Sequence, residues 1–312
     1  MEIDKAALYQ PLDRIREYVG GVSYLNLDSH YFEAIRTTPM LLAFSVGALI
    51  TALSIFRLNY GKAKPTLDPT TWQRFPLVEK EEISPNTARY RFQLPKKDSM
   101  LGLPIGQHLS VQVDVNGKMV QRSYTPTTSD DEVGFFDLVV KTYPDGAVSS
   151  YIGCMRMGDL LEVKGPKGQM RYHAELAREI GCIAGGTGIT PILQVIRQIL
   201  KDPDDNTRVS FIYANVTEKD ILLKQELDDL AAKHDQFKVH YFLGKPPDGW
   251  TGGKGFITKE AIDEYLPSPK HDSKILMCGP PPMIDACKKH LDELGFAKPR
   301  PMSKMDDQVF CF

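Results

Sequence analysis

The first segment whose residue types could do chemistry is residues 122–126, with the sequence RSYTP, at the end of a predicted strand. An arginine guanidinium can hold a diphosphate through two hydrogen bonds. The tyrosine adds a ring and a hydroxyl, and the threonine adds a short donor. Such a segment alone is more often an ordinary strand with an exposed arginine. It becomes informative only when other phosphate-binding signals accompany it.

Two glycine turns could bind phosphate through backbone N–H groups. Residues 146–150 (GAVSS) follow a predicted strand, and residues 185–191 (GGTGITP) lie between a predicted strand and a helix. Glycine lets the backbone approach a phosphate, and a helix N-terminus adds partial positive charge. The second turn departs from the standard dinucleotide fingerprint at Pro191 and lacks the Gly-Lys-Ser/Thr ending of a P-loop. For both turns, a purely structural helix start is the alternative.

A fourth segment, residues 278–283 (CGPPPM), ends the last predicted apolar strand. In an open parallel sheet, the carboxyl ends of the strands line the crevice where ligands bind. Cys278 could be read as a nucleophile, but no histidine upstream has an evident pairing role. A free cysteine is usually a small buried hydrophobe. We therefore expect Cys278 to pack beside a ligand.

The first two segments lie in a region with period-two alternation of apolar side chains. Turns such as Asn116-Gly117 separate the alternating stretches. This pattern predicts antiparallel strands that close into a small β-barrel over residues 72–175. The clearest alternating stretches are ARYRFQL, HLSVQVDV and FFDLVVK.

The last two segments lie where strands alternate with helices. The stretch TPILQVIRQILKD has apolar residues at helical spacing, with Thr190 as the predicted N-cap and Pro191 at the first helical position. Further strands and helices follow in turn: VSFIYAN, EKDILLKQELDDLAAKH, FKVHYFL, KILMCG and PPMIDACKKHLDELG. This alternation predicts a doubly wound parallel α/β sheet over residues 176–312.

Near the N-terminus, the segment TTPMLLAFSVGALITALSIF carries no charge and has the length of a helix that spans about 30 Å of bilayer. A buried core helix is the alternative, although the apolar residues cover every face. The acidic residues before it argue against a cleaved leader. We predict an N-terminal tail (1–36), a transmembrane helix as anchor (37–57) and a linker (58–71). The cations that follow place the later residues in the cytosol: Arg57, Lys62, Lys64 and Arg74.

Composition narrows the possible functions. The formal net charge of −2 gives no reason to expect nucleic-acid binding. The 5 cysteines form no CxxC pair, which argues against a structural zinc site or a dithiol site. Free thiols fit a reducing compartment.

The four segments in this order, together with the C-terminal DDQVFCF, resemble the NADH–cytochrome b5 reductases of the ferredoxin–NADP reductase superfamily. The resemblance covers residues 70–312, and the anchor is similar to that of fungal microsomal or outer-mitochondrial members. It implies an FAD domain followed by an NADH domain. It further implies hydride transfer from NADH to FAD, then single-electron transfer to cytochrome b5. Related enzymes also serve other small iron proteins, including in diphthamide synthesis.

The resemblance also assigns roles to individual residues. Arg122 holds the FAD pyrophosphate, Tyr124 packs beside the isoalloxazine and Thr125 lies near flavin N5. Thr125, Lys141 and Cys278 are expected beside the reacting groups, and no metal is expected. The other FAD residues are Ser123, Val139, Val140, Lys141, Tyr143, Gly146, Ala147, Val148, Ser149 and Thr190. The NADH residues are Gly185, Gly186, Thr187, Gly188, Pro191, Cys278, Gly279, Pro280 and Met283. Phe312 is expected to pack near the flavin.

Two departures from animal relatives stand out. Gly244, followed by Lys245, occupies the position of an acidic residue that binds the adenine ribose, which weakens the expected preference for NADH over NADPH. The segment between Tyr143 and Gly146 is short and lacks a lysine-bearing loop, so Lys141 and Lys164 are left to steer an acidic cytochrome. His108 is interpreted as a histidine of the barrel wall.

Two other functions remain open from the residues alone. One is an NADPH-dependent flavin reductase that serves a quinone or ferric acceptor. The other is a non-catalytic membrane scaffold that keeps a degenerate barrel. For the favoured function we expect a monomer in the mitochondrial outer membrane or the endoplasmic reticulum, with its catalytic domains in the cytosol.

Overall fold

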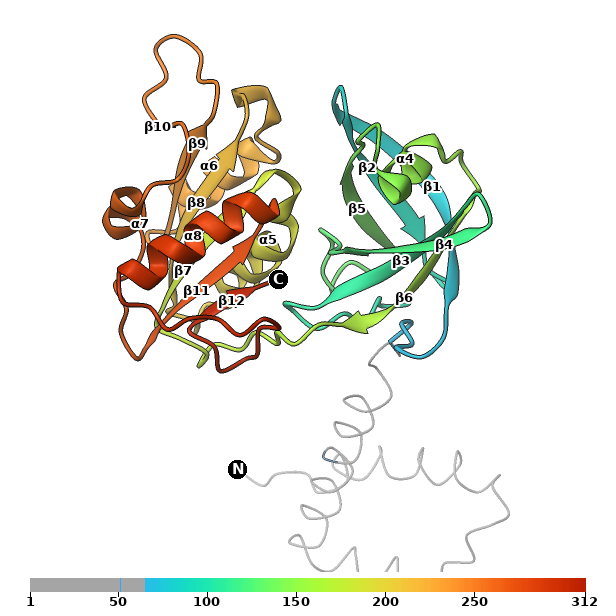
Figure 1. Ribbon diagram of the computed structural model, residues 1–312. Coiled ribbons are helices and arrows are strands. Elements are labelled where there is room, and N and C mark those ends of the chain that lie inside the picture. Colours follow the sequence, from blue (N-terminus) through green and yellow to red (C-terminus); the bar gives the residue numbers. More distant parts are fainter. Residues whose placement is uncertain (1–50, 52–64) are drawn as a thin grey trace, which may run out of the picture. The chain divides into compact units, whose positions relative to one another are not determined.

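The computed structural model describes Thr51 and residues 65–312. The predicted tail, the anchor apart from Thr51, and residues 58–64 of the linker lie outside the described residues. Within the described part, no helix is both long and apolar enough to cross a membrane. The described residues from Pro65 onward belong to one compact unit, which holds two β-sheets (Figure 1).

The first sheet is antiparallel throughout, as the alternating pattern predicts. Its strand order is β4-β3-β6-β1-β2-β5, and the helix α4 (Ala147–Cys154) follows β5. The strands are β1 (Gln73–Ser84), β2 (Thr87–Gln93), β3 (His108–Val115), β4 (Lys118–Tyr124), β5 (Phe135–Lys141) and β6 (Leu160–Lys167).

The core of this sheet forms from the predicted alternating positions. Phe92, Leu109 and Phe136 are fully buried in one cluster to which distant strands contribute, so the sheet curls over a shared core. The predicted closure into a barrel is incomplete in hydrogen bonding, because no ladder joins the edge strands β4 and β5 within residues 65–312. Instead α4 contacts β3, β4 and β5. Along β5 the residue out of phase, Val139, is also buried, and it packs in the core of the other sheet.

The second sheet is parallel, with the order β10-β9-β8-β7-β11-β12. Its strands are β7 (Glu179–Gly185), β8 (Arg208–Asn215), β9 (Phe237–Leu243), β10 (Gly253–Lys254), β11 (Ser273–Cys278) and β12 (Val309–Cys311). Its helices are η1 (Gly186–Gly188), α5 (Ile189–Lys201), η2 (Glu218–Asp220), α6 (Lys224–Lys233), α7 (Lys259–Tyr265) and α8 (Pro281–Glu293).

Helices cover both faces of this sheet, so the predicted doubly wound arrangement is confirmed. Ile192 of α5 and Leu227 of α6 pack in one apolar cluster, whereas Ile262 of α7 and Ile284 of α8 pack in another. The short strand β12 was not predicted, since three residues carry no readable periodicity. It pairs with β11, and the backbone N–H of Phe312 donates to the carbonyl of Met277 at 3.0 Å.

The predicted start of α5 is wrong by a few residues. The helix begins at Ile189 after the 3₁₀ turn Gly186–Gly188, so Gly188 is the N-cap. Thr190 lies inside the first turn, and its hydroxyl donates to the carbonyl of Thr187 at 3.2 Å. Pro191 is the third helical residue, where its missing N–H costs no intrahelical bond. The glycine turn is itself helical, which shifts the start towards the N-terminus.

Candidate functional site

One cavity of about 1310 Å³ brings together all four segments singled out in the sequence. Both sheets contribute to its wall. Every residue with a predicted catalytic or cofactor-binding role lines it: Arg122, Ser123, Tyr124, Thr125, Val139, Val140, Lys141, Tyr143, Gly146, Ala147, Val148, Ser149, Gly185, Gly186, Thr187, Gly188, Thr190, Pro191, Cys278, Gly279, Pro280 and Met283. Phe312 lines it as well. Their individual roles stay predictions.

On the side of the parallel sheet, the cavity opens at the point where the strand order reverses. β7 leads into α5 on one face, and its neighbour β11 leads into α8 on the other face. Ligands of open α/β sheets bind in the crevice at such a switch point. Cys278 pairs with Ala184 in the ladder, so the glycine turn and the CGPPPM segment leave the same sheet edge side by side.

The glycines of this turn serve different purposes. A Cβ on Gly188 would overlap the carbonyl of Cys278, with its carbon only 2.6 Å away. A Cβ on Gly185 would lie 2.8 Å from atoms of both Pro280 and Met283. These two glycines are therefore required by close packing between the two segments. Gly186 has φ +53° and no atom within 4 Å of the Cβ position, so its backbone is open to a ligand.

On the side of the antiparallel sheet, the first turn of α4 faces the cavity. No side chain caps this helix, so its first backbone N–H groups are free to bind an anion. The hydroxyl of Ser149 donates to the carbonyl of Gly146 at 3.1 Å and accepts from the N–H of Tyr143 at 3.4 Å. Arg122 is exposed, and its Nη1 donates to the carbonyl of Gln121 at 2.7 Å, but it forms no ion pair with any described residue. A turn, an uncapped helix end and an exposed guanidinium together suit a diphosphate.

An ion pair links the two sheets at the cavity wall. Nζ of Lys141, on β5, lies 2.9 Å from Oδ1 of Asp220, on η2. The hydroxyl of Thr217 donates to Oδ2 of Asp220 at 2.7 Å. This hydrogen bond, and then the contact with Lys141, lower the pKa of Asp220. The carboxylate therefore stays charged at neutral pH, and Lys141 is partly neutralised rather than a free steering charge.

Three titratable side chains of the cavity wall, Tyr124, Cys278 and His108, are electrically neutral at physiological pH. Burial raises the pKa of Tyr124 to about 12, and burial followed by the neighbouring Cys311 raises that of Cys278 to about 12. Burial and the nearby Lys167 lower the pKa of His108. The Cys278 thiol is thus no thiolate nucleophile, in agreement with the packing role expected from the sequence.

Other residues also line the cavity: His108, which the sequence places in the barrel wall, and Asn215 and Phe256, which the sequence did not single out. His108 lies at its wall because β3 and β4 are paired with Leu109 opposite Tyr124, which puts His108 level with Thr125. Asn215 ends β8 at the ligand-binding edge, and neither of its buried amide atoms has a hydrogen-bond partner among the described residues. The sequence signal that could have identified Asn215 is its position at the carboxyl end of a predicted parallel strand. Phe256 is 92% exposed at the rim.

Two family models match the chain. The oxidoreductase FAD-binding domain matches residues 74–172, and the oxidoreductase NAD-binding domain matches residues 182–289. Among curated relatives, the NADH-cytochrome b5 reductase 1 of Mycosarcoma maydis is 60% identical over 88% of this chain and 87% of its own length. That of Aspergillus clavatus is 53% identical over 85% and 89%.

Solved structures agree with this match. The cytochrome b5 reductase domain of Ulva prolifera nitrate reductase has a TM-score of 0.73 at 36% identity, covering 80% of this chain and 100% of that chain. The CS-b5R domains of human Ncb5or have a TM-score of 0.67 at 24% identity, covering 78% and 69%, and this likeness shows the fold alone.

Proposed function

This chain belongs to the NADH–cytochrome b5 reductase family, and we propose that it carries electrons from NADH through bound FAD to cytochrome b5. The observation that carries this function is the single cavity in which all four motif segments meet. Its volume of about 1310 Å³ exceeds the range of roughly 300–1,000 Å³ that is usual for one small ligand. Two dinucleotides side by side need such a space.

The residues of the antiparallel sheet fit FAD. Arg122 and the uncapped first turn of α4 supply donors for the pyrophosphate. The partly buried Tyr124 and the buried Thr125 supply a ring and a hydroxyl for the isoalloxazine. When bound, FAD supplies the chemistry that converts a two-electron donor into two one-electron transfers.

The residues of the parallel sheet fit NADH. The open backbone at Gly186 and the unpaired amide of Asn215 are available to a nucleotide along the strand ends. Cys278 and Met283 close the wall beside the glycine turn. These neutral groups exclude water and align the two nucleotides, which is what transfer of hydride requires of the protein.

Anaerobic stopped-flow spectroscopy tests this function in two steps. We expect the purified protein to be yellow, to bleach when mixed with NADH, and then to reduce cytochrome b5 in a second mixing. Colourless protein would favour a non-catalytic scaffold. A bleached flavin that reduces cytochrome b5 slowly or not at all would refute the acceptor while leaving the flavin chemistry intact. The same assay, with other small iron proteins as acceptors, tests the wider acceptor range.

The nucleotide preference is a separate measurement. Gly244 at the cavity wall carries no acidic side chain that would repel the 2′-phosphate of NADPH. NADH is nevertheless the donor named for the curated relatives. We expect kcat/KM to remain higher for NADH than for NADPH. The reverse order would favour an NADPH-dependent flavin reductase, whose acceptor would then be sought among quinones and ferric compounds.

The membrane anchor is part of the proposal. The uncharged length of residues 37–57 and the cations that follow support a single-pass helix with the later residues in the cytosol. The predicted membrane is the mitochondrial outer membrane or the endoplasmic reticulum. A short tether there would concentrate the enzyme beside a membrane-held partner.

Alkaline carbonate extraction of isolated fungal membranes tests the anchor. The full chain should stay in the pellet, whereas protease added to intact organelles should remove the catalytic part. Release of the full chain by carbonate would disprove an integral anchor. Sedimentation in detergent should give a monomer.

A further inference from the structure

One side of α5 fastens the parallel sheet to the antiparallel sheet outside the nucleotide cavity. Its contacts come from Gln194, Arg197 and Lys201, which lie three and four residues apart and hence on one helix face. The side-chain oxygen of Gln194 accepts from the N–H of Gly106 at 2.7 Å. Lys201 pairs with Asp131, but both side chains are more than half exposed, so this pair contributes little.

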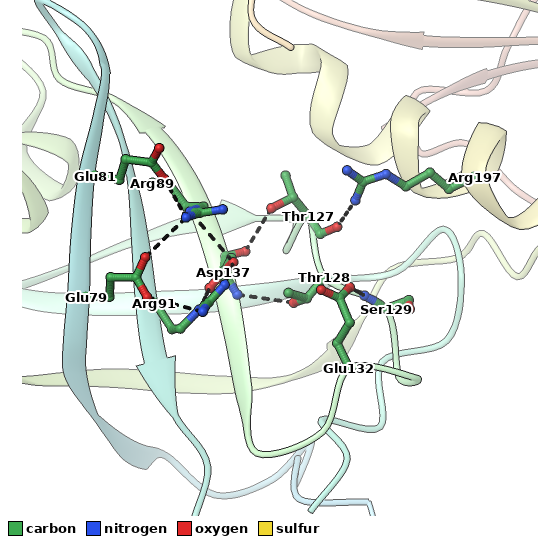
Figure 2. A network of polar contacts seen from close by, with 10 residues as sticks. All are labelled: Glu79, Glu81, Arg89, Arg91, Thr127, Thr128, Ser129, Glu132, Asp137 and Arg197. Carbon is green, nitrogen blue, oxygen red and sulfur yellow. Dashed lines mark hydrogen bonds and ion pairs between the residues drawn. The ribbon is translucent and has the colours of Figure 1, made fainter. Parts of the chain in front are cut away.

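Arg197 makes the most specific of these contacts. Its Nη1 donates to the backbone carbonyl of Thr127, in the loop that follows β4 (Figure 2). Its other edge binds Glu226 of α6, with Nε and Nη2 each 2.6 Å from the same carboxylate oxygen. One guanidinium therefore joins a carboxylate of its own α/β part to the backbone of the β-sheet part. A lysine ammonium lacks the flat, forked geometry needed for both at once.

The loop that Arg197 holds is continuous with the predicted flavin segment. Thr127 lies two residues after the buried Thr125, which lines the cavity. The N–H of Thr127 donates to the carbonyl of Asp137 at 3.0 Å, and the N–H of Asp137 donates to the hydroxyl of Thr128 at 3.1 Å. Two hydrogen bonds, one donated by the loop and one donated by β5, therefore hold this loop against β5.

The far end of this connection is also rigid. The carboxylate of Asp137 is nearly buried, and it accepts two hydrogen bonds of 2.8 Å from the neighbouring strand's Arg91. Arg91 in turn pairs with Glu79 on β1 at 3.2 Å (Figure 2). A displacement of Thr127 would therefore strain three strands of the sheet.

The helix end of the connection reaches the other nucleotide segment. Thr190 and Pro191, in the first turn of α5, line the cavity. Arg197 lies about 10 Å further along the same helix, given a rise of about 1.5 Å per residue. Because a helix moves as a rod over this distance, the contact between Arg197 and Thr127 also fixes the position of the first turn of α5 at the cavity.

We propose that Arg197 is a positioning residue. It sets the distance and angle between the predicted flavin-binding residues 122–126 and the predicted NADH-binding residues 185–191. The proposal rests on the function proposed above. Arg197 is not among the cavity residues, so it acts on alignment and not on nucleotide contacts. Its loss should slow hydride transfer at saturating NADH while leaving nucleotide affinity nearly unchanged.

The test compares Arg197→Gln and Arg197→Lys with the control Arg208→Gln. Arg208 also holds a carboxylate, that of Glu179 at 2.5 Å, but both residues belong to the parallel sheet. In the FAD-loaded full chain, Arg197→Gln should lower the rate of flavin reduction about tenfold or more, since misplacement by about 1 Å can cost up to about 100-fold. The dissociation constant of NAD⁺ should change less than about threefold, and the control should match the unsubstituted protein. The lysine variant should recover the rate only in part.

A second readout does not depend on turnover. Amide hydrogen exchange of residues 125–132, measured in FAD-loaded protein without NADH, should accelerate in Arg197→Gln and not in the control. An unchanged reduction rate with unchanged exchange would overturn the proposal, as would full recovery by lysine. If the unsubstituted protein is not reduced by NADH at all, the proposed function fails, and the exchange measurement still tests the role of Arg197 in holding the loop.

Discussion

The two glycine turns of the cavity look alike in the sequence but are built for different reasons. At the turn before α4, a Cβ on Gly146 would overlap only the hydroxyl of Ser149, three residues away. At the turn before α5, a Cβ on Gly188 would overlap backbone atoms of Cys278 and Gly279, some 90 residues along the chain by sequence number. The first turn is a local device that shapes an anion site. The second is a seam between two segments of the nucleotide crevice.

The largest effect is expected from Gly188→Ala. Backbone atoms at 2.6 Å and 2.9 Å from the new Cβ cannot rotate away, so the two segments must separate. Overpacking of this kind costs about 3 kcal/mol or more when the neighbours are rigid. Urea unfolding should show this loss, and titration should show weakened NAD⁺ binding. An unchanged unfolding midpoint in Gly188→Ala would show that Gly188 is not required by packing against Cys278 and Gly279, and the two turns would then not differ in this way.

Gly146→Ala should have a smaller effect that can be repaired. The clashing atom is a side-chain hydroxyl, so the double variant with Ser149→Ala removes the overlap. We expect the single variant to bind FAD about tenfold more weakly, equivalent to about 1.4 kcal/mol, and the double variant to regain part of it. Release of flavin followed by fluorescence measures both. Failure of Ser149→Ala to rescue would show that the remaining neighbours at Tyr143 matter instead.

Gly244 provides a third kind of glycine, with no atom nearer than 3.9 Å to its Cβ position. Gly244→Asp should therefore leave stability within about 0.5 kcal/mol. Its carboxylate should lower the ratio of kcat/KM for NADPH to that for NADH about fivefold, an effect of about 1 kcal/mol. Gly244→Asn has the same size without the charge and should leave the ratio near that of the unsubstituted protein. Equal ratios in both variants would place the adenine ribose elsewhere.

The smallest effect concerns the ion pair that joins the strand before the first turn to the other sheet. The lowered pKa of Asp220 means that its stabilising contribution is complete above the ordinary value of 3.8 and is lost as the pH falls through the lowered pKa. Asp220→Asn should cost about 1 kcal/mol or less at pH 6. Denaturant unfolding between pH 6 and pH 2.5 should show the two proteins converging in acid. A constant difference throughout would exclude this titration as its source.

Much of the fold follows from patterns in the sequence. Alternating side chains such as Tyr90, Phe92 and Leu94 predict the antiparallel strands, since one face of each must be buried. The family resemblance that the four motif segments carry predicts which residues meet in the cavity. Strand and helix alternation predicts the parallel sheet and hence its ligand-binding edge.

Other features depend on tertiary context and could not be read from the chain. Thr190 has the residue type of an N-cap, but the preceding glycines already form a helical turn. Arg197 has the pattern of a solvent-exposed helix residue, and only docking of the loop at Thr127 gives it a specific partner. No ladder joins β4 and β5 among the described residues, and α4 contacts both strands instead.

The burial of Val139 limits how parts of this protein can be exchanged with those of its relatives. Val139 and Met170 belong to the part of the chain that carries the antiparallel sheet, yet both complete the apolar core around α5. Severing the two halves would leave each with an unfilled contact surface. Chimeras built by swapping one half for that of a distant relative should therefore fold poorly, unless these two residues and the facing side of α5 are transplanted together. The two sheets share one apolar core and should be exchanged as a single unit.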